Sequence, residues 1–319
     1  MDVQAYLRRI DRFQQRHRLV AFPFAVVKKF GDDQAGNLAA LIAYFGFFSL
    51  FPLLLVFYSV VGLVVRGNPH LQQTLLHSAL RNFPVVGSDI KVHSITGNGI
   101  ALAIGIVGTL WAGLGVTQMA QNAMNTVWGV PRKDWPNFLF SRVRSLEMLA
   151  ILGTITVVAT FASGLGASAG ASVPLRLAGF AATLILNLAL FLLSYRVLTV
   201  KELRWGDVLP GSVVAAVLWT ALQSVGGYYV THQLKGATNT YGTFAVVIGL
   251  LVWLYLGAQI TLYSAEINVV RVRKLWPRSL VQPPLIANDK RVLETAAKQQ
   301  QARSEQRIEV TFEETSEGG

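Results

Sequence analysis

Six long stretches without a single acidic or basic side chain limit how this chain can fold. Within its 319 residues, Asp, Glu, Lys and Arg are absent from residues 34–65, 92–131, 148–175, 177–195, 208–234 and 236–265. A helix crosses a bilayer core about 30 Å thick with about 20 mainly apolar residues, and a charge inside that core costs roughly 3 kcal/mol or more. The pattern predicts an all-α polytopic membrane protein with six transmembrane helices, at about 38–65, 99–120, 148–170, 177–195, 208–230 and 242–265.

The 28 Lys and Arg residues are divided unevenly among the segments that link these stretches. When alternate segments are assigned to opposite sides of the membrane, one side holds 23 of them and the other holds 5. Basic residues close to the ends of membrane helices favour the cytoplasmic side. Because both termini belong to the basic side, the sequence predicts that the N- and C-termini lie in the cytoplasm.

Polar segments flank the membrane domain, which we place at residues 34–270. The leading segment, residues 1–33, begins with an amphipathic pattern in which arginines surround one apolar stripe. The stripe consists of Val3, Leu7, Ile10 and Phe13. Such a helix either lies in the layer of lipid headgroups or docks on the protein's own base. Residues 271–319 have few apolar side chains, so we expect a solvated helix or, over most of this tail, disorder.

A second amphipathic helix is predicted in the first outside loop, residues 66–98. Its apolar positions recur at helical spacing and are followed by Pro84, which ends the pattern. They are Leu71, Leu75, Leu76, Leu80 and Phe83.

The net charge of +11 at pH 7 could indicate binding to nucleic acid. Most of the basic residues, however, lie beside the uncharged stretches, where membrane orientation and anionic lipid headgroups account for them. Membrane lipids are therefore the expected partners, and nucleic acid is not. The chain has no cysteine, which excludes disulfides and thiolate metal sites.

Two polar faces near the cytoplasmic ends of predicted helices are candidate functional sites. The first consists of Gln118, Gln121, Asn122 and Asn125, and the second of Tyr255, Gln259, Tyr263 and Glu266. Both sets recur at three- and four-residue steps, so each shares one side of a helix. They could line a cavity that opens to the cytoplasm and takes a small polar or amphiphilic solute. Alternatively, the amides join helices, and Glu266 pairs with Arg271 or Arg273.

Pro52 lies in the middle of the first predicted span and is a candidate hinge. Proline has no N–H, so the carbonyl of Phe48 loses its helical partner and must find another one in a membrane. The sequence predicts a kink or local unwinding here, with Ser49 as a nearby partner.

No catalytic, cofactor-binding or metal-binding signature is present. The histidines, His17, His70, His77, His93 and His232, form no pair with the spacing of metal ligands. Phosphate-binding loops, nucleophile elbows and dinucleotide-binding fingerprints are also absent. We therefore expect no cofactor and do not expect an enzyme.

Three segments in this order resemble the YihY/BrkB family of bacterial inner-membrane proteins. Residues 38–53 read LAALIAYFGFFSLFPL, residues 125–132 read NTVWGVPR, and WLYLGAQ at 253–259 is followed by AEIN at 265–268. The resemblance covers about residues 20–278. It implies six spans, a location in the bacterial cytoplasmic membrane and no settled molecular activity. Some members of that family were named virulence factors, and an earlier label as ribonuclease BN is regarded as a misassignment.

These observations leave two classes of function open. One is transport or lipid handling through a polar cavity, and the other is a non-transporting structural or envelope-assembly role. A ribonuclease is disfavoured because a metal-dependent nuclease needs clustered carboxylates or histidines to activate water. None of the 17 acidic residues lies deep in a predicted span.

The predicted topology can be tested with single cysteines, since the natural chain has none. In intact cells, a membrane-impermeant maleimide should label cysteines placed at Gly97, Ser172 and Thr238. It should not label cysteines at Lys133, Lys201 and Lys274. The reverse pattern would overturn the orientation.

Overall fold

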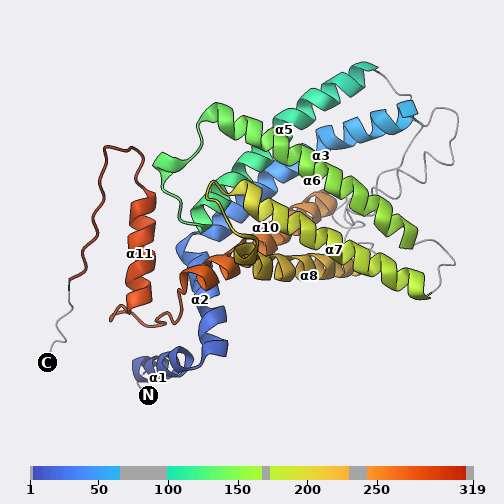
Figure 1. Cartoon of the computed structure of the whole chain (residues 1–319). Coiled ribbons are helices and arrows are strands. Elements are labelled where there is room, and N and C mark those ends of the chain that lie inside the picture. Colours follow the sequence, from blue (N-terminus) through green and yellow to red (C-terminus); the bar gives the residue numbers. More distant parts are fainter. Residues whose placement is uncertain (1–2, 65–98, 167–172, 230–242, 314–319) are drawn as a thin grey trace.

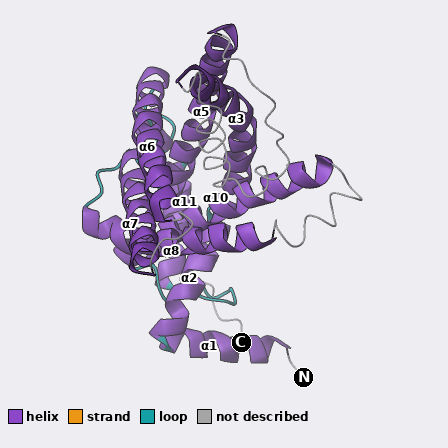
Figure 2. Ribbon diagram, turned by 90° about the vertical axis from the view of Figure 1, so that its right-hand side faces the viewer, coloured by secondary structure: helices purple, strands orange, loops and turns teal. Residues whose placement is uncertain are grey.

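In the fold, a computed structural model shown in Figure 1, all regular secondary structure of the described residues, 3–64, 99–166, 173–229 and 243–313, is helical. The α-helices are α1 (Val3–Arg16), α2 (Arg18–Asp32), α3 (Ala35–Val64), α5 (Gly99–Val127), α6 (Phe138–Gly166), α7 (Val173–Leu198), α8 (Trp205–Tyr229), α10 (Thr243–Arg273) and α11 (Ala287–Gln299), with a 3₁₀ turn, η1, at Arg132–Asp134. Figure 2 shows no strand in the described part of the chain. The predicted all-α class is confirmed.

The long helices pack as a closed ring. In the order α3, α5, α6, α7, α8 and α10, each contacts the next, and α10 returns to contact α3. Across the ring, α5 also contacts α7 and α10. Figures 1 and 2 both show α3 and α5 side by side. Glycines allow this close approach, because a Cβ added at Gly115 would collide with the ring of Phe45.

Segments of three of these helices are long and apolar enough to cross a membrane. They are Leu177–Leu198, Trp205–Gly226 and Val247–Arg273. A shorter apolar segment, Ala35–Leu50, forms the first half of α3. Each predicted span falls largely within one long helix, and the described residues include these three helices that are able to span a bilayer.

The packed core lies at the end of the ring that carries α1, α2 and α11 (Figure 1). Large side chains that are fully buried include Trp128, Tyr195, Met148 and Leu262. Three helices reach this end because they extend beyond the predicted apolar spans. α5 continues to Val127, α6 begins at Phe138, and α10 continues to Arg273.

α5 ends in a Schellman motif, which explains why a glycine stands four residues after Asn125. Gly129 has a φ of +59°, its N–H bonds to the carbonyl of Thr126, and the N–H of Val130 bonds to the carbonyl of Asn125 at 2.9 Å. Glycine adopts this left-handed conformation without steric cost. A Cβ at Gly129 would also collide with Thr295 of α11, so the turn allows the tail to approach.

α8 crosses α10 at an unusually close point. The N–H of Gly211 donates to Oδ1 of Asn268 at 2.7 Å, and a Cβ at Gly211 would collide with the backbone carbonyl of Ser264. Pro210, next to it, cannot donate to the carbonyl of Gly206, four residues earlier. That carbonyl accepts instead from Nη1 of Arg271 at 2.9 Å.

The prediction of local unwinding at Pro52 is wrong, because α3 is continuous from Ala35 to Val64. The Ser49 hydroxyl donates to the carbonyl of Gly46 at 2.7 Å rather than to that of Phe48. Gly108 of α5 packs against the Pro52 ring. The role of Pro52 as a hinge stays a prediction.

The expectation of a largely disordered tail differs from the structure. Residues 287–299 form α11, and the segment before it is held on α1 and α2, with Arg278 and Ser279 buried. The prediction rested on the low apolar content of the tail. In the structure, polar and ionic contacts rather than an apolar core hold the tail on the protein. The helix predicted in the first outside loop lies outside the described residues.

Replacing Gly211 by alanine should destabilise the protein by about 1 to 3 kcal/mol, because the added methyl group must push α8 and α10 apart. Gly153 of α6 is a matched control, since nothing lies within 4 Å of a Cβ added there. Thermal unfolding of the detergent-purified variants measures both effects. Equal melting temperatures for Gly211→Ala and Gly153→Ala would contradict the close crossing.

Candidate functional site

The predicted amide face of α5 consists of Gln118, Gln121, Asn122 and Asn125. Gln121 is only 2% exposed and donates from Nε2 to Oγ of Ser145 at 2.9 Å. The hydroxyl of Ser141 lies within hydrogen-bond distance of Oε1 of Gln118, at 2.6 Å, and of Gln121, at 3.2 Å. Gln118 in turn donates to Oδ1 of Asn122 at 3.3 Å. Buried carboxamides must be paired, and serines of α6 supply most of the partners here.

Asn125 connects three parts of the chain. Its Oδ1 accepts from the backbone N–H of Val200, in the loop between α7 and α8, at 3.0 Å. Its carbonyl and that of Thr126 lie 3.4 and 3.0 Å from Nε2 of Gln299, near the end of α11. Gln299 therefore gives a second donor to carbonyls that already accept from N–H groups of the Schellman motif.

The predicted face of α10 consists of Tyr255, Gln259, Tyr263 and Glu266. The ring of Tyr263 stacks on Phe30 of α2, with centroids 3.7 Å apart and planes at 3°. Tyr255 lies beside Gly36 at the start of α3, and Gln259 is half-buried. The junction between α2 and α3 thus covers much of this face.

Glu266 is fully buried at the end of this face. Its Oε2 lies 3.8 Å from Nζ of Lys29, which also forms an ion pair with Asp33. No N–H or hydroxyl group of the described residues donates to Glu266, and its carboxyl group faces that of Asp33. Burial raises the pKa of Asp33 above its ordinary value, although Lys29 opposes that shift. Two carboxyl groups therefore share one buried ammonium group.

The sequence misidentified the ionic partner of Glu266. Arg271 donates to the carbonyl of Gly206, and Arg273 donates to the carbonyl of Trp128. Lys29 occupies the expected place instead. It comes from α2, which lies far away in the sequence, so only the packing of α2 on α10 brings the two charges together.

The structure brings the two polar faces to the same end of the bundle but gives them different neighbours. The amide face bonds to α6 and to the α7–α8 loop, whereas the α10 face packs on α2 and α3. Within the described residues, no hydrogen bond or ion pair joins one face to the other. A cavity shared by both faces stays a prediction.

A second ionic cluster, which the sequence analysis missed, fixes the tail. Arg278 donates from Nε to Asp289 at 2.5 Å and from Nη2 to Asp32 at 2.9 Å. Lys28 lies 3.2 Å from the same Asp289, whose other oxygen accepts from Ser279. Although burial opposes ionisation, the bonds from Ser279 and Arg278 lower the pKa of Asp289 to about 2. We call Lys28, Asp32, Arg278, Ser279 and Asp289 the tail clasp.

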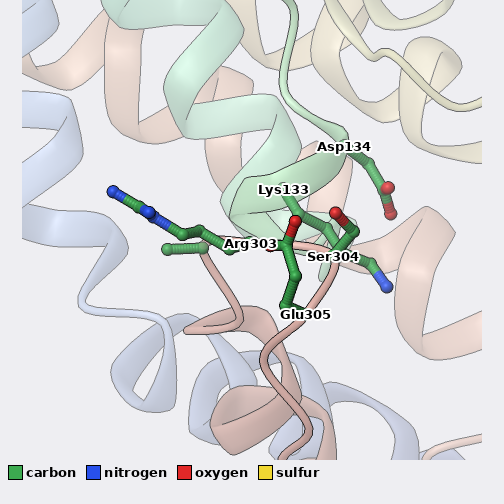
Figure 3. A pocket seen from close by; sticks show the side chains of 6 residues that line it. Lys133, Asp134, Arg303, Ser304 and Glu305 are labelled. Carbon is green, nitrogen blue, oxygen red and sulfur yellow. The ribbon is translucent and has the colours of Figure 1, made fainter.

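The hollow in Figure 3 lies where η1 meets the chain beyond α11. The backbone N–H of Lys133 donates to the carbonyl of Gln301 at 2.8 Å and joins the two segments. The side chains around the hollow carry opposite charges and are exposed, which suits a solvated surface. No group of three or more potential metal ligands occurs in the described part of the chain.

The sequence matches the family described as virulence factor BrkB over residues 26–283. A UPF0761 membrane protein of Pseudomonas paraeruginosa is 28% identical over 283 residues, which cover 84% of this chain and 67% of that protein. The inner membrane protein YhjD of Escherichia coli is 23% identical over 274 residues, which cover 79% of this chain and 81% of YhjD.

Some relatives are considerably longer than the matched region. The chain spans 64% of a UPF0761 membrane protein of Azotobacter vinelandii, to which it is 28% identical over 275 residues and 79% of its own length. No solved structure matches the chain. Together with the apolar helices, these relatives confirm a multi-pass protein of the bacterial inner membrane.

Asp289→Asn should release the tail, because it leaves the buried Arg278 with Asp32 alone, at a cost of roughly 2 to 3 kcal/mol. Trypsin cleavage near Lys290 and Arg291 should become at least about tenfold faster. Glu294→Gln is the control, since Glu294 forms only an exposed pair with Lys298. Unchanged cleavage of Asp289→Asn would disprove the clasp.

The clasp should also depend on pH. Because the pKa of Asp289 is depressed, its contribution to the stability of the folded tail is complete above about pH 4 and is lost as pH falls toward 2.

Proposed function

The chain belongs to the BrkB family of bacterial membrane proteins, and from this starting point we propose that it crosses the inner membrane six times and moves a small polar or amphiphilic solute. Both termini lie in the cytoplasm in this proposal, as the distribution of basic residues favours. The closed ring of α3, α5, α6, α7, α8 and α10 supports six crossings, since each helix has 25 or more residues. No catalytic step is part of the proposal.

The observation that carries the proposal is the complete burial of Glu266 beside only one cation, Lys29, and a second carboxyl group, Asp33. A carboxylate in this position contributes little to stability, because the cost of removing it from water can exceed the attraction of Lys29. Ionisable residues retained in membrane helices usually belong to pathways for solutes, ions or protons. Glu266 and Asp33, which share Lys29, are suited to bind a polar group or a proton at the cytoplasmic end.

The amide face supports a path on the same side. Gln118 and Asn122 are only partly buried, whereas Gln121 and Asn125 are fixed by neighbouring elements. The partly buried pair can exchange its mutual hydrogen bond for one to a solute. The α2–α3 junction covers the acidic end of the α10 face. Movement of α3 about Pro52 would shift this junction and open the ring between α3 and α10.

A non-transporting role in envelope structure or assembly is the second candidate. The hydrogen bonds of Gln121 to α6 and of Asn125 to the α7–α8 loop favour it, since they account for these buried amides by packing alone. In that case Glu266 is a structural ion pair. The two candidates differ in what an isosteric change at Glu266 does.

Glu266→Gln should abolish a phenotype that the intact gene complements, or shift its pH dependence, while folded protein remains in the membrane. The change keeps the shape but removes the charge that faces Lys29, Asp33 and Arg273. Glu147→Gln is the control because Glu147 is an exposed acid of α6. Complementation, membrane abundance and the melting temperature are measured for each variant.

The outcomes separate the two candidates. Loss of function at normal abundance and stability supports solute movement. If Glu266→Gln behaves as wild type, or loses function only in proportion to folded protein, the transport proposal fails and the structural role remains. Gln121→Leu, which removes the donor to Ser145 and one of the two acceptors of Ser141, provides the reference for a change that acts through stability.

A further inference from the structure

α1 is docked on the rest of the protein through polar side chains rather than through its apolar stripe. Asp11 and Gln14 are buried, at 7% and 4% exposure. Oδ1 of Asp11 accepts from the backbone N–H of Leu280 at 2.9 Å, and Nε2 of Gln14 donates to the carbonyl of Arg278 at 2.6 Å. Although burial opposes ionisation, the bond from Leu280 and those from Gln14 and Gln15 lower the pKa of Asp11.

The described part of the apolar stripe of α1, which is Leu7, Ile10 and Phe13, is left exposed. Phe13 is 57% exposed, and Tyr6, which extends the stripe on the same side, is 65% exposed. Leu7 and Ile10 are also exposed, and the surface continues onto α2 at Leu19. A helix surrounded by water alone would bury this stripe and expose Asp11 and Gln14.

The arginines of α1 complete the pattern of an interfacial helix. At about 100° per residue, Arg9 and Arg16 lie roughly 100° to 120° from the centre of the apolar stripe, at its border. Arg8 and Arg12 lie on the opposite side. Asp11 lies at the other border and Gln14 lies between Ile10 and Leu7, so the tail contacts the Leu7 side of the helix, and Tyr6 and Phe13 are left on the side nearer Arg9 and Arg16.

We propose that α1 lies on the cytoplasmic leaflet of the inner membrane, with Tyr6, Leu7, Ile10 and Phe13 among the acyl chains and Arg9 and Arg16 on anionic lipid headgroups. The chain is an inner-membrane protein, so a bilayer surface borders the end of the bundle from which α1 extends. Apolar side chains enter that surface readily, and each Arg near anionic lipid adds about 1 kcal/mol of attraction. The tail residues that bind Asp11 hold the helix in this orientation.

Single cysteines in the full-length chain test this arrangement. A fluorescent label at Phe13→Cys should be quenched by lipids that carry a spin label near the headgroup, in nanodiscs that contain one protomer each. A label at Arg12→Cys, on the opposite side of the helix, is the matched control and should be quenched at least about twofold less. Quenching at position 13 should increase when phosphatidylglycerol replaces part of the phosphatidylcholine, and it should decrease at roughly 1 M salt, where charges are screened within about 3 Å.

A variant with Arg9→Gln and Arg16→Gln tests the anionic contact separately. It should lose the increase that phosphatidylglycerol causes while the melting temperature stays unchanged, because both arginines are exposed. Equal quenching at positions 12 and 13, or the same quenching in both lipid compositions, would overturn the proposal. The proposal would also fail if the label at position 13 is shielded from the lipid quencher only in discs that hold two protomers, since the stripe would then bind a second copy.

Discussion

The last turns of α10 hold together the end of the bundle that carries α1, α2 and α11. Along little more than two turns, this helix contacts α2 through Glu266, α8 through Asn268 and Arg271, and the end of α5 through Arg273. Each contact joins a side chain of α10 to a buried charge or to a backbone group of a neighbouring element. The close crossing with α8, the end of α5 and the position of α2 all depend on this segment.

Polar contacts can fix helices here because the environment offers few alternatives. Apolar side chains of membrane helices gain little by leaving lipid for protein, so shape, small residues and hydrogen bonds decide which helices meet. The serines of α6 pair with Gln121, and Gly211 lets a backbone N–H reach Asn268. The tail applies the same chemistry outside the membrane, where Gln299 reaches the last carbonyls of α5.

The clasp and α1 form one unit with the bundle. Arg278 and Asp289 hold the segment after α10 against α2, and the neighbouring backbone of Leu280 holds Asp11 of α1. The family match ends at residue 283, before α11 begins. α11 is thus an addition to the matched region that is anchored by side chains on both sides of that boundary.

The sequence by itself determined that the chain is helical, that it belongs in a membrane and where its long helices lie, because uncharged stretches of that length have few other stable forms. It also identified Gln121, Asn125 and Glu266 as polar groups needing partners. The tertiary structure alone decided those partners: Ser145 for Gln121, Val200 for Asn125, and Lys29 rather than a nearby arginine for Glu266. It also ordered the tail and left Tyr6 and Phe13 of α1 exposed. These results depend on contacts between residues far apart in the chain, and local periodicity carries no information about which distant side chain will satisfy a buried charge.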